Sequence, residues 1–286
     1  MILSGSARLA GVFGWPVAHS RSPRLHGFWL DRHRIDGAYV PLPVRPDRFA
    51  DAVRALRDLG FRGGNVTIPH KEAAFAVCDR VTRRAERAGA VNTLVFDADG
   101  TIAGDNTDGW GFLESLRTAI PALDLAGRTA VVLGAGGAAR AIAAALLDEG
   151  AQVALVNRTP DRAAALARAL GGAIAAHAWD AVHALLPAAD LLINTTALGM
   201  KGTPSPVLPL ERLPDHAIVA DIVYVPRRTG LLCAAERRGL CTVGGLGMLL
   251  HQARPGFAAW FGIDPVVDAE LEAFVAADIP ETDEAA

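Results

Sequence analysis

Apolar runs alternate with segments of helical character along most of the chain. In the first third, the apolar runs predict strands at residues 7–14, 37–44 and 63–69. Between them, amphipathic segments predict helices at 22–35, 46–60 and 71–78. Ser22 is predicted to cap the first of these helices, with Pro23 at its first position. The alternation predicts an α/β fold in which a mostly parallel sheet is covered by helices.

The rest of the chain continues the pattern. Residues 90–106 predict a hairpin that turns at Asp99–Gly100. A second α/β block begins near Gly127, with strands expected within 129–150 and at 152–159, 189–196 and 217–226. Helices are expected at 109–120, 160–171 and from about 248 to 277, and the acidic tail 279–286 is expected to fray. A boundary near residues 105–110 therefore separates two α/β domains.

Composition narrows the class of protein. The chain has 286 residues, 51% of them hydrophobic and 21% charged, which is enough apolar material for two domains. The net charge of −3 gives no basic excess for nucleic acid. The start of the chain does not resemble a signal peptide, and no apolar stretch has the ~20 residues of a membrane span, so no membrane partner is expected. Its three cysteines suggest neither disulfides nor a metal site, which is typical of a cytoplasmic protein.

The second block opens with a glycine turn. Gly134, Ala135, Gly136, Gly137, Ala138 and Ala139 match G-x-G-x-x-A, and the match follows an apolar strand and begins a long helix. In that context the turn and the helix N-terminus suit a dinucleotide pyrophosphate, as in a Rossmann-like domain. The alternative is an ordinary glycine-rich turn.

The end of the next strand indicates which dinucleotide is bound. An NAD site usually has Asp or Glu about 20 residues after the glycines, to bond the ribose. Here that place holds Asn157, Arg158 and Thr159, with Arg162 one helical turn later. A guanidinium attracts a 2′-phosphate, so these residues predict NADP rather than NAD. The alternative is a solvated helix start with Thr159 as its N-cap.

Four further segments carry polar residues at positions that are normally apolar in a buried core. They are residues 14–23 with Ser20 and Ser22, 65–71 with Thr67 and Lys71, 89–93 with Asn92, and 104–109 with Asp108. Taken singly, each has an ordinary explanation: an N-cap serine, a solvated surface lysine, a satisfied buried amide, and a polar turn.

Together these segments resemble the shikimate dehydrogenase family. The resemblance rests on GWPVAHSRSPRLH (14–26), NVTIPHK (65–71), GAVNT (89–93), NTDG (106–109), GAGGAAR (134–140), NRTPDR (157–162), INTTALGM (193–200), DIVYVPRRTGLL (221–232) and GGLGMLLHQA (244–253). It runs from about residue 11 to residue 262. Gly244, where many members have Asp, and Arg83, where some have an acidic residue, depart from the family pattern.

The resemblance implies the roles of individual residues. Ser20, Ser22 and Tyr224 would bind the substrate carboxylate, and Thr67, Asn92 and Gln252 would hold ring hydroxyls. Lys71 and Asp108 would form the catalytic pair. Gly134, Ala135, Gly136, Gly137 and Ala138 would hold the pyrophosphate, Asn157, Arg158, Thr159 and Arg162 the 2′-phosphate end, and Ile222 and Gly245 the nicotinamide.

The implied activity is the reversible reduction of 3-dehydroshikimate to shikimate, in the biosynthesis of chorismate and the aromatic amino acids. Ketone reduction needs a group that stabilises and protonates the developing alkoxide, and Lys71 with Asp108 can supply it. Which of the two transfers the proton stays open.

We therefore expect a substrate-binding and catalytic domain at 1–108 plus 247–286, and an NADP-binding domain at 109–246. The alternatives are a quinate/shikimate dehydrogenase of broader range, a non-catalytic dinucleotide-binding sensor, and a folate-linked dehydrogenase, which leaves the paired serines unexplained. The sequence does not determine the oligomeric state, and a homodimer is one of the possibilities.

Overall fold

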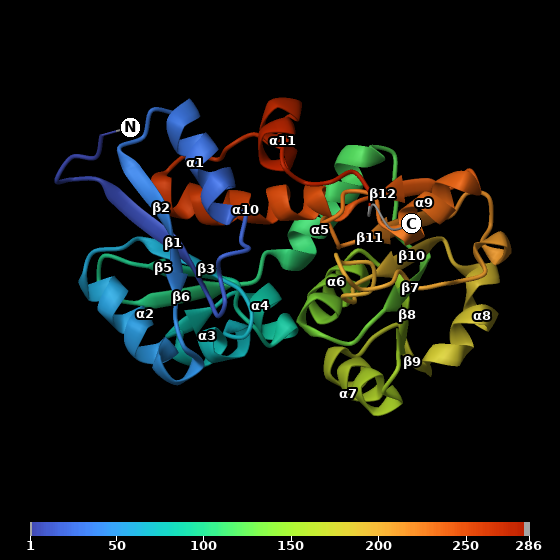
Figure 1. Ribbon diagram of the computed structural model, residues 1–286. Helices are drawn as coiled ribbons and strands as arrows, with labels where there is room; N and C mark the ends of the chain where they lie inside the picture. The colour runs from blue at the N-terminus through green and yellow to red at the C-terminus, as the bar shows by residue number, and fades with distance from the viewer. Residues whose placement is uncertain (1, 283–286) are drawn as a thin grey trace. The chain divides into compact units, whose positions relative to one another are not determined.

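The computed structural model describes residues 2–282, which fall into two compact units (Figure 1). Unit 1 comprises residues 2–107 and 252–277, and unit 2 comprises 108–251 and 278–282. The division thus falls after residues 107 and 251, against the expected 108 and 246. The second division lies within one continuous helix, α10 (Gly245–Phe261), rather than in a loop.

Unit 1 contains a mixed six-stranded sheet of order β2-β1-β3-β5-β6-β4. Its strands are β1 (Arg8–Gly14), β2 (Gly37–Pro43), β3 (Gly63–Val66), β4 (Arg80–Val81), β5 (Thr93–Phe96) and β6 (Ile102–Asp105). Strands β1, β2 and β3 run parallel, whereas β5 is antiparallel to both β3 and β6. The predicted hairpin is confirmed: Gly100 adopts φ +87°, and Thr101 N donates to Asp99 Oδ1 at 2.9 Å.

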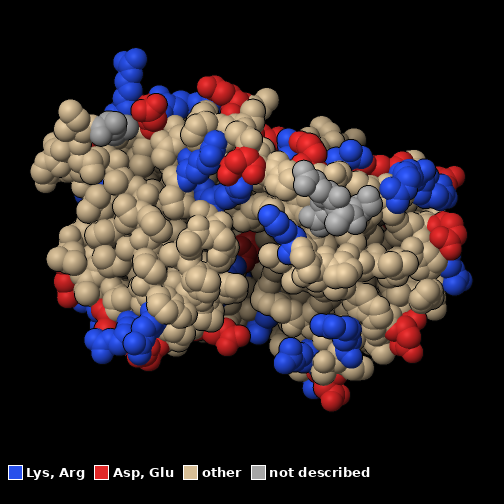
Figure 2. All heavy atoms as spheres, viewed as in Figure 1, with Lys and Arg blue, Asp and Glu red and all other residues tan. Residues whose placement is uncertain are grey.

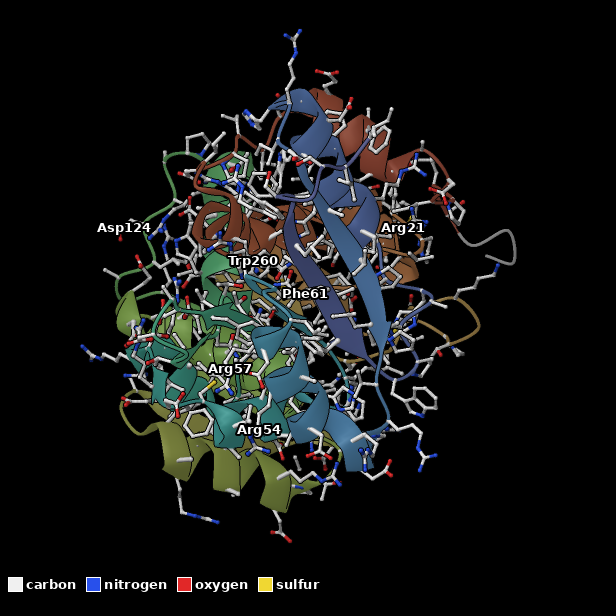
Figure 3. All side chains as sticks on the ribbon, turned by 90° about the vertical axis from the view of Figure 1, so that its left-hand side faces the viewer. Arg21, Arg54, Arg57, Phe61, Asp124 and Trp260 are labelled. Atoms are coloured by element: carbon white, nitrogen blue, oxygen red, sulfur yellow. The ribbon has the colours of Figure 1, made fainter. Side chains whose placement is uncertain are left out.

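Helices cover both faces of this sheet. They are α1 (Ser22–Arg32), α2 (Phe49–Asp58) after a 3₁₀ turn at Pro46–Arg48, α3 (Lys71–Val77), α4 (Arg83–Ala88), α11 (Ala269–Ala276) and the second part of α10. Helices α2, α3 and α4 lie on one face and α1 and α10 on the other (Figure 1). Trp260 of α10, labelled in Figure 3, is buried and donates from Nε1 to Leu94 O at 2.9 Å, which fixes α10 to the sheet.

Two local predictions in unit 1 are wrong. Ser22 is the first residue of α1 rather than its N-cap, and the N-cap residue Arg21 makes no side-chain cap bond. The strand expected at 63–69 ends at Val66, because residues 67–70 form a turn closed by His70 N donating to Thr67 O at 3.0 Å. Both corrections move side chains proposed for the site out of regular strand or cap positions.

Unit 2 contains an all-parallel, Rossmann-like sheet of order β12-β11-β10-β7-β8-β9. Its strands are β7 (Thr129–Leu133), β8 (Gln152–Asn157), β9 (Ile174–Ala178), β10 (Leu191–Asn194), β11 (Ile218–Asp221) and β12 (Cys241–Val243). Strand β10 ends at Asn194, before the predicted 196, and β11 ends at Asp221, before the predicted 226. The residues that follow them form loops at the carboxyl edge of the sheet, where parallel sheets bind ligands.

The strands of unit 2 are buried on both faces, as continuous apolar runs in parallel sheets usually are. The helices are α5 (Asp108–Ala119), α6 (Gly137–Asp148), α7 (Pro160–Leu170), α8 (Val182–Leu185), α9 (Gly230–Arg237) and the first part of α10, with 3₁₀ turns at Trp179–Ala181, Leu186–Ala188 and Leu210–Arg212. On β7, Ala130 and Val132 pack with α5, α6 and α7, whereas Val131 and Leu133 pack with α8 and α9. Successive side chains of a strand point to opposite faces of the sheet, so each face has its own core.

The end of the chain differs from the prediction in two ways. The helical stretch expected at 248–277 is broken into α10 and α11 by Gly262, at φ +80°, and a loop to Asp268. Residues 279–281 are held against unit 2, since Arg227 N donates to Pro280 O at 2.9 Å and Arg228 N to Glu281 O at 2.8 Å. Residues 283–286 of the expected frayed tail lie outside the described residues.

Within residues 2–282, no helix is long and apolar enough to cross a membrane. The same residues contain no group of three His, Cys, Asp or Glu side chains placed to hold a metal ion.

Candidate active site

The segment 65–71 lies where β3 gives way to α3. Thr67 N donates to Phe13 O at 2.9 Å, and Lys71, half-buried, is the first residue of α3. His70 between them is buried, and its Nε2 lies 2.8 Å from Val44 O. Burial lowers the pKa of His70, so a neutral imidazole anchors the turn. Thr67 and Lys71 therefore stand at the two ends of a turn fixed to the sheet.

The Asn92 side chain lies at the centre of the polar residues in unit 1. It is 2% exposed, its Oδ1 accepts from Thr107 N at 2.9 Å, and its Nδ2 donates to Thr107 Oγ1 at 3.0 Å. Thr107 Oγ1 in turn donates to Gln252 O, on α10, at 2.8 Å. Next to Asn92, Val91 N donates to Lys71 O at 2.9 Å. Four predicted segments of the site are thus joined around one buried amide.

The paired serines lie at the start of α1. Ser22 N donates to Ser20 Oγ at 3.3 Å, so the two residues share one tight turn, and Ser22 is 7% exposed. Behind them, the buried His26 ring stacks on Tyr39 with 3.9 Å between centroids. Burial lowers the pKa of His26 to about 3 and raises the pKa of Tyr39, so the floor beneath the serines is uncharged.

Asp108 is the first residue of α5 and of unit 2, and it is 6% exposed. The loop before it is tied to unit 1 by Asn106, whose Nδ2 donates to Ala90 O at 3.0 Å. Asp105 is paired with Arg84, whose Nε donates at 2.6 Å. Burial alone would raise the pKa of Asp105, but the contributions of Arg84, Thr82 and Asn106 together outweigh it and the pKa is lowered. An ionised Asp105 therefore secures the loop that leads to Asp108.

The glycine turn of unit 2 follows β7. Gly134 adopts φ +112°, and a Cβ there would lie 2.8 Å from Thr195 Oγ1, so the turn itself requires glycine. At Gly136 and Gly137, by contrast, a Cβ would meet no protein atom within 4 Å. Packing therefore does not require glycine at these two positions. The space next to them, at the N-terminus of α6, is open. Such space suits a pyrophosphate approaching backbone N–H groups.

The end of β8 carries the two arginines. Arg158 and Arg162 are exposed, and neither guanidinium has a carboxylate partner among residues 2–282. Asn157 Nδ2 donates to Thr159 O at 2.9 Å, which orders the turn between them. Thr159 occupies the N-cap position of α7 but makes no side-chain cap bond. The strand end thus presents two cations and an available hydroxyl, as a bound 2′-phosphate would need.

Ile222 and Gly245 are brought together within unit 2. A Cβ at Gly245 would come 2.1 Å from Ile222 O, so only glycine permits this close approach. Tyr224 lies two residues beyond Ile222, in the loop after β11. The three residues predicted from this part of the family pattern therefore belong to one loop and the helix start packed on it.

That loop is held by a carboxylate that the sequence reasoning missed. Asp221, 1% exposed, accepts from Asn194 Nδ2 at 2.9 Å and Val223 N at 3.0 Å through Oδ1, and from Thr229 Oγ1 at 2.8 Å through Oδ2. Burial raises the pKa of Asp221 to about 6 against these three donors. The sequence did contain a signal for this role: Asp221 is a polar residue at the end of an apolar strand, at the start of DIVYVPRRTGLL.

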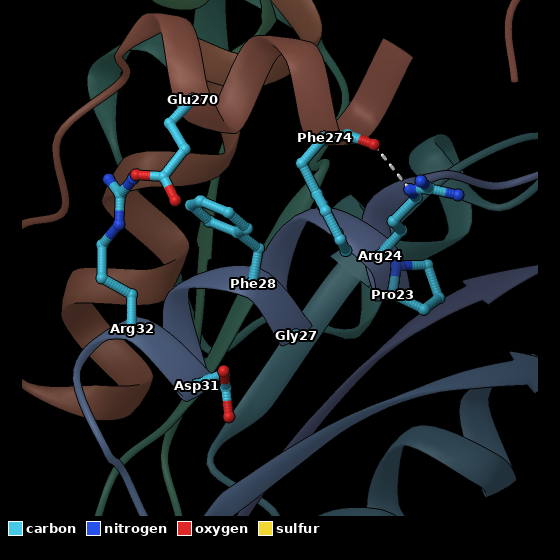
Figure 4. A pocket seen from close by; sticks show the side chains of 8 residues that line it. All are labelled: Pro23, Arg24, Gly27, Phe28, Asp31, Arg32, Glu270 and Phe274. Atoms are coloured by element: carbon cyan, nitrogen blue, oxygen red, sulfur yellow. Dashed lines mark hydrogen bonds and ion pairs between the residues drawn. The ribbon is translucent and has the colours of Figure 1, made fainter. Parts of the chain in front are cut away.

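A separate groove lies between α1 and α11 (Figure 4). Arg24 lies over the Phe274 ring at 4.6 Å, and Arg32 over Phe28 at 4.5 Å while it pairs with Glu270. None of the predicted site residues lines this groove. On the face drawn in Figure 2, basic and acidic side chains are interspersed rather than gathered by sign.

Comparisons with known proteins identify the same family that the sequence motifs resemble. Residues 12–94 match the model of the shikimate dehydrogenase substrate binding domain, and residues 116–211 match that of shikimate/quinate 5-dehydrogenase. The chain is 62% identical to the NADP⁺ shikimate dehydrogenase of Acidiphilium cryptum, with 98% of this chain and 99% of that one covered. The corresponding protein of Rhodospirillum rubrum is 56% identical, with 96% and 99% covered.

Solved structures are also similar. The shikimate 5-dehydrogenase of Thermus thermophilus, in complex with NADP(H) and shikimate, has a TM-score of 0.84 at 37% identity, with 94% of this chain and 99% of that one covered. A quinate dehydrogenase from Corynebacterium glutamicum, in complex with NAD, has a TM-score of 0.88 at 30% identity, with 95% and 99% covered.

Proposed function

The chain belongs to the shikimate dehydrogenase family, and from this premise we propose that it reversibly reduces 3-dehydroshikimate to shikimate with NADP. The reaction is a step in the biosynthesis of aromatic amino acids. The observation that carries the proposal is the match to the NADP-dependent relatives over nearly the whole chain, which includes both the glycine turn of unit 2 and the polar segments of unit 1.

We assign substrate binding to unit 1, assisted by Tyr224. The substrate carboxylate binds to Ser20, Ser22 and Tyr224, and the ring hydroxyls bind to Thr67, Asn92 and Gln252. The Ser22–Ser20 turn supports the first assignment because Ser22 N donates to Ser20 Oγ, which holds both residues together at the start of α1. The bonds of Asn92 to Thr107, and of Thr107 to Gln252 O, support the second because they order the amide before a ligand arrives.

We assign NADP binding to unit 2. Gly134, Ala135, Gly136, Gly137 and Ala138 hold the pyrophosphate, while Asn157, Arg158, Thr159 and Arg162 hold the 2′-phosphate end. Ile222 and Gly245 line the nicotinamide position. The open space at Gly136 and Gly137, and the two arginines without a carboxylate partner among the described residues, support this fit. Bound NADP supplies the hydride chemistry that the protein's own side chains lack.

Lys71 and Asp108 are proposed as the catalytic pair. Lys71 stabilises and protonates the oxygen that gains negative charge as the ketone is reduced, and it takes the proton back in the reverse direction. Asp108 orients Lys71 and accepts a hydrogen bond from the substrate. Two bonds support the pairing: Lys71 O accepts from Val91 N, and Thr107, the residue before Asp108, is bonded to the adjacent Asn92.

A Lys71→Met variant tests this role, with Lys71→Arg as the charge-retaining control. We expect Lys71→Met to lower kcat by about 10²–10⁴, the usual contribution of general acid–base catalysis, and to leave the Kd for NADP unchanged. The assay follows the absorbance of reduced nicotinamide with shikimate and NADP. Turnover by Lys71→Met equal to that of the unaltered protein would exclude lysine as the acid.

A broader quinate/shikimate dehydrogenase is the second candidate, favoured by the similarity to the quinate dehydrogenase of Corynebacterium glutamicum. Measuring kcat/KM for shikimate and quinate, each with NADP and NAD, separates the two. We expect the highest value for shikimate with NADP, because Arg158 and Arg162 attract the 2′-phosphate. Efficient quinate oxidation with NAD would favour the second candidate, and no turnover with either substrate would favour a non-catalytic sensor.

We also propose a cytoplasmic location. The three cysteines Cys78, Cys233 and Cys241 are all free thiols, as is usual for proteins of a reducing compartment.

A further inference from the structure

A continuous chain of buried hydrogen bonds crosses unit 1 beneath the proposed substrate site. Tyr39 Oη donates to Asn65 Oδ1 at 2.7 Å, and Asn65 Nδ2 lies 3.3 Å from Thr93 Oγ1. Thr93 Oγ1 donates to Asn92 Oδ1 at 2.9 Å, and the Asn92–Thr107–Gln252 bonds described above complete the chain. Tyr39, Asn65, Thr93, Asn92 and Thr107 are all buried, so water does not compete for these bonds.

Backbone groups fix the direction of this chain. Gln252 O can only accept, so the single proton of Thr107 Oγ1 points to it, and this oxygen must accept from Asn92 Nδ2. Thr107 N can only donate, so the atom it meets on Asn92 is Oδ1. At the other end, Asn65 Nδ2 also lies 3.3 Å from Asn92 O, a backbone acceptor, which sets the orientation of the Asn65 amide.

The consequence concerns the Asn92 amide. Its Oδ1 accepts from the Thr93 hydroxyl at 2.9 Å and from the Thr107 N–H at 2.9 Å, and it also lies 3.2 Å from Thr107 Oγ1. A flip of the amide would place the NH₂ group against the Thr107 N–H and the oxygen against a hydroxyl whose proton is already directed to Gln252 O. The flip therefore removes the buried hydrogen bond from Thr107 N and opposes two N–H groups.

We propose that Thr93, supported by Asn65, is a positioning residue that locks the Asn92 amide so that it meets the substrate only as a hydrogen-bond donor. The site then selects a ring oxygen that accepts a hydrogen bond. This inference rests on the proposed role of Asn92 as a ligand of a ring hydroxyl. Thr93 itself acts through Asn92 and is not proposed to touch the substrate.

The test compares two variants of Thr93. Thr93→Val keeps the shape but removes the hydroxyl, and Thr93→Ser keeps the hydroxyl. Shikimate binding is measured by titration calorimetry without NADP, and KM for shikimate and for NADP by the absorbance assay. We expect Thr93→Val to raise the Kd and KM for shikimate about tenfold, the usual effect of one lost buried hydrogen bond. The KM for NADP should not change, and Thr93→Ser should retain the values of the unaltered protein.

Substrate analogues provide a further measurement, the discrimination between shikimate and analogues that lack a hydroxyl. A residue with a purely structural role would not change this discrimination. Two shikimate analogues, each lacking one of the non-reacting ring hydroxyls, are compared with shikimate. We expect the unaltered protein and Thr93→Ser to discriminate against one of them, and Thr93→Val to lose most of that discrimination. If Thr93→Val does not fold, Thr93→Ala replaces it, because Ala and Ser differ only in the hydroxyl.

The outcomes separate this inference from the proposed function. Unchanged shikimate affinity and discrimination in Thr93→Val would overturn the positioning role while leaving the enzyme assignment intact. Equal losses in Thr93→Val and Thr93→Ser would also overturn it, because packing rather than the hydroxyl would then be responsible. Failure of the unaltered protein to oxidise shikimate with NADP would instead overturn the proposed function.

Discussion

Replacing Asp221 by Asn should change how the stability of the protein depends on pH. The carboxyl group is buried, and its pKa rises from the usual 3.8 to about 6 in the folded chain. The folded state therefore binds the proton more tightly than the unfolded state does. The stability that this group contributes is fully present below pH ~4 and is lost as the pH rises through 6.

The size of the effect follows from the shift. A difference of about 2 pKa units corresponds to about 3 kcal/mol of unfolding free energy over the whole titration, and about 1.4 kcal/mol of this falls between pH 5 and pH 8. An asparagine does not titrate, so the variant lacks this component. It also has only one oxygen for the donors Asn194, Val223 and Thr229, which adds a destabilisation that does not depend on pH.

Urea unfolding of both proteins at pH 5 and pH 8, followed by far-ultraviolet circular dichroism, measures the effect. The stability margin of the unaltered protein over Asp221→Asn should be smaller at pH 8 by about 1.4 kcal/mol. Taking the difference between the two proteins removes the contributions of all other titrating groups. A margin that is equal at both pH values, or larger at pH 8, would refute a raised pKa at Asp221.

Four further substitutions test the NADP site. Arg158→Ala and Arg162→Ala should each raise the KM for NADP about tenfold and leave the KM for NAD nearly unchanged, because each removes a charge-assisted bond to an exposed phosphate; an unaltered NADP-to-NAD preference in initial-rate kinetics would contradict this. Gly245→Ala should lower Tm and weaken NADP binding, because the added Cβ would lie 2.1 Å from Ile222 O. An unchanged Tm and an unchanged affinity for NADP would show that the loop moves aside without cost. Gly134→Ala should cost about 1–2 kcal/mol in urea unfolding because of its positive φ of +112°, and an unchanged midpoint would contradict that.

Local signals made much of the fold predictable. The hairpin at Asp99–Gly100 and the turn at Gly134 depend on residues adjacent in sequence, and both are confirmed. The strands β4, β9 and β12 were missed, because they are edge strands of only two, five and three residues. The Ala-rich β9, at Ile174–Ala178, lacks any clear alternation. Its strand state comes from pairing with β8, which is not a local property.

The candidate site was predictable only in part. The motifs identified Asn92 and Lys71, but not what orders them. Asn65 and Thr93 are 28 positions apart and meet only because β3 and β5 pair in that register. Asp221 and Asn194 likewise face each other across β10 and β11. Such contacts depend on tertiary structure, so a single sequence read along its length does not reveal them.

The order of synthesis has a consequence for unit 1, because its last part, residues 252–277, is encoded after residues 108–251 of unit 2. Phe257 and Trp260 of α10 pack with Trp29, Tyr39 and His26, so this aromatic layer cannot close until α10 has been made. Residues 108–251 are translated first, and at about 5–20 residues per second this takes roughly 7–30 s. During that time the growing chain exposes an incomplete apolar face, and a ribosome-associated chaperone would find its binding site there.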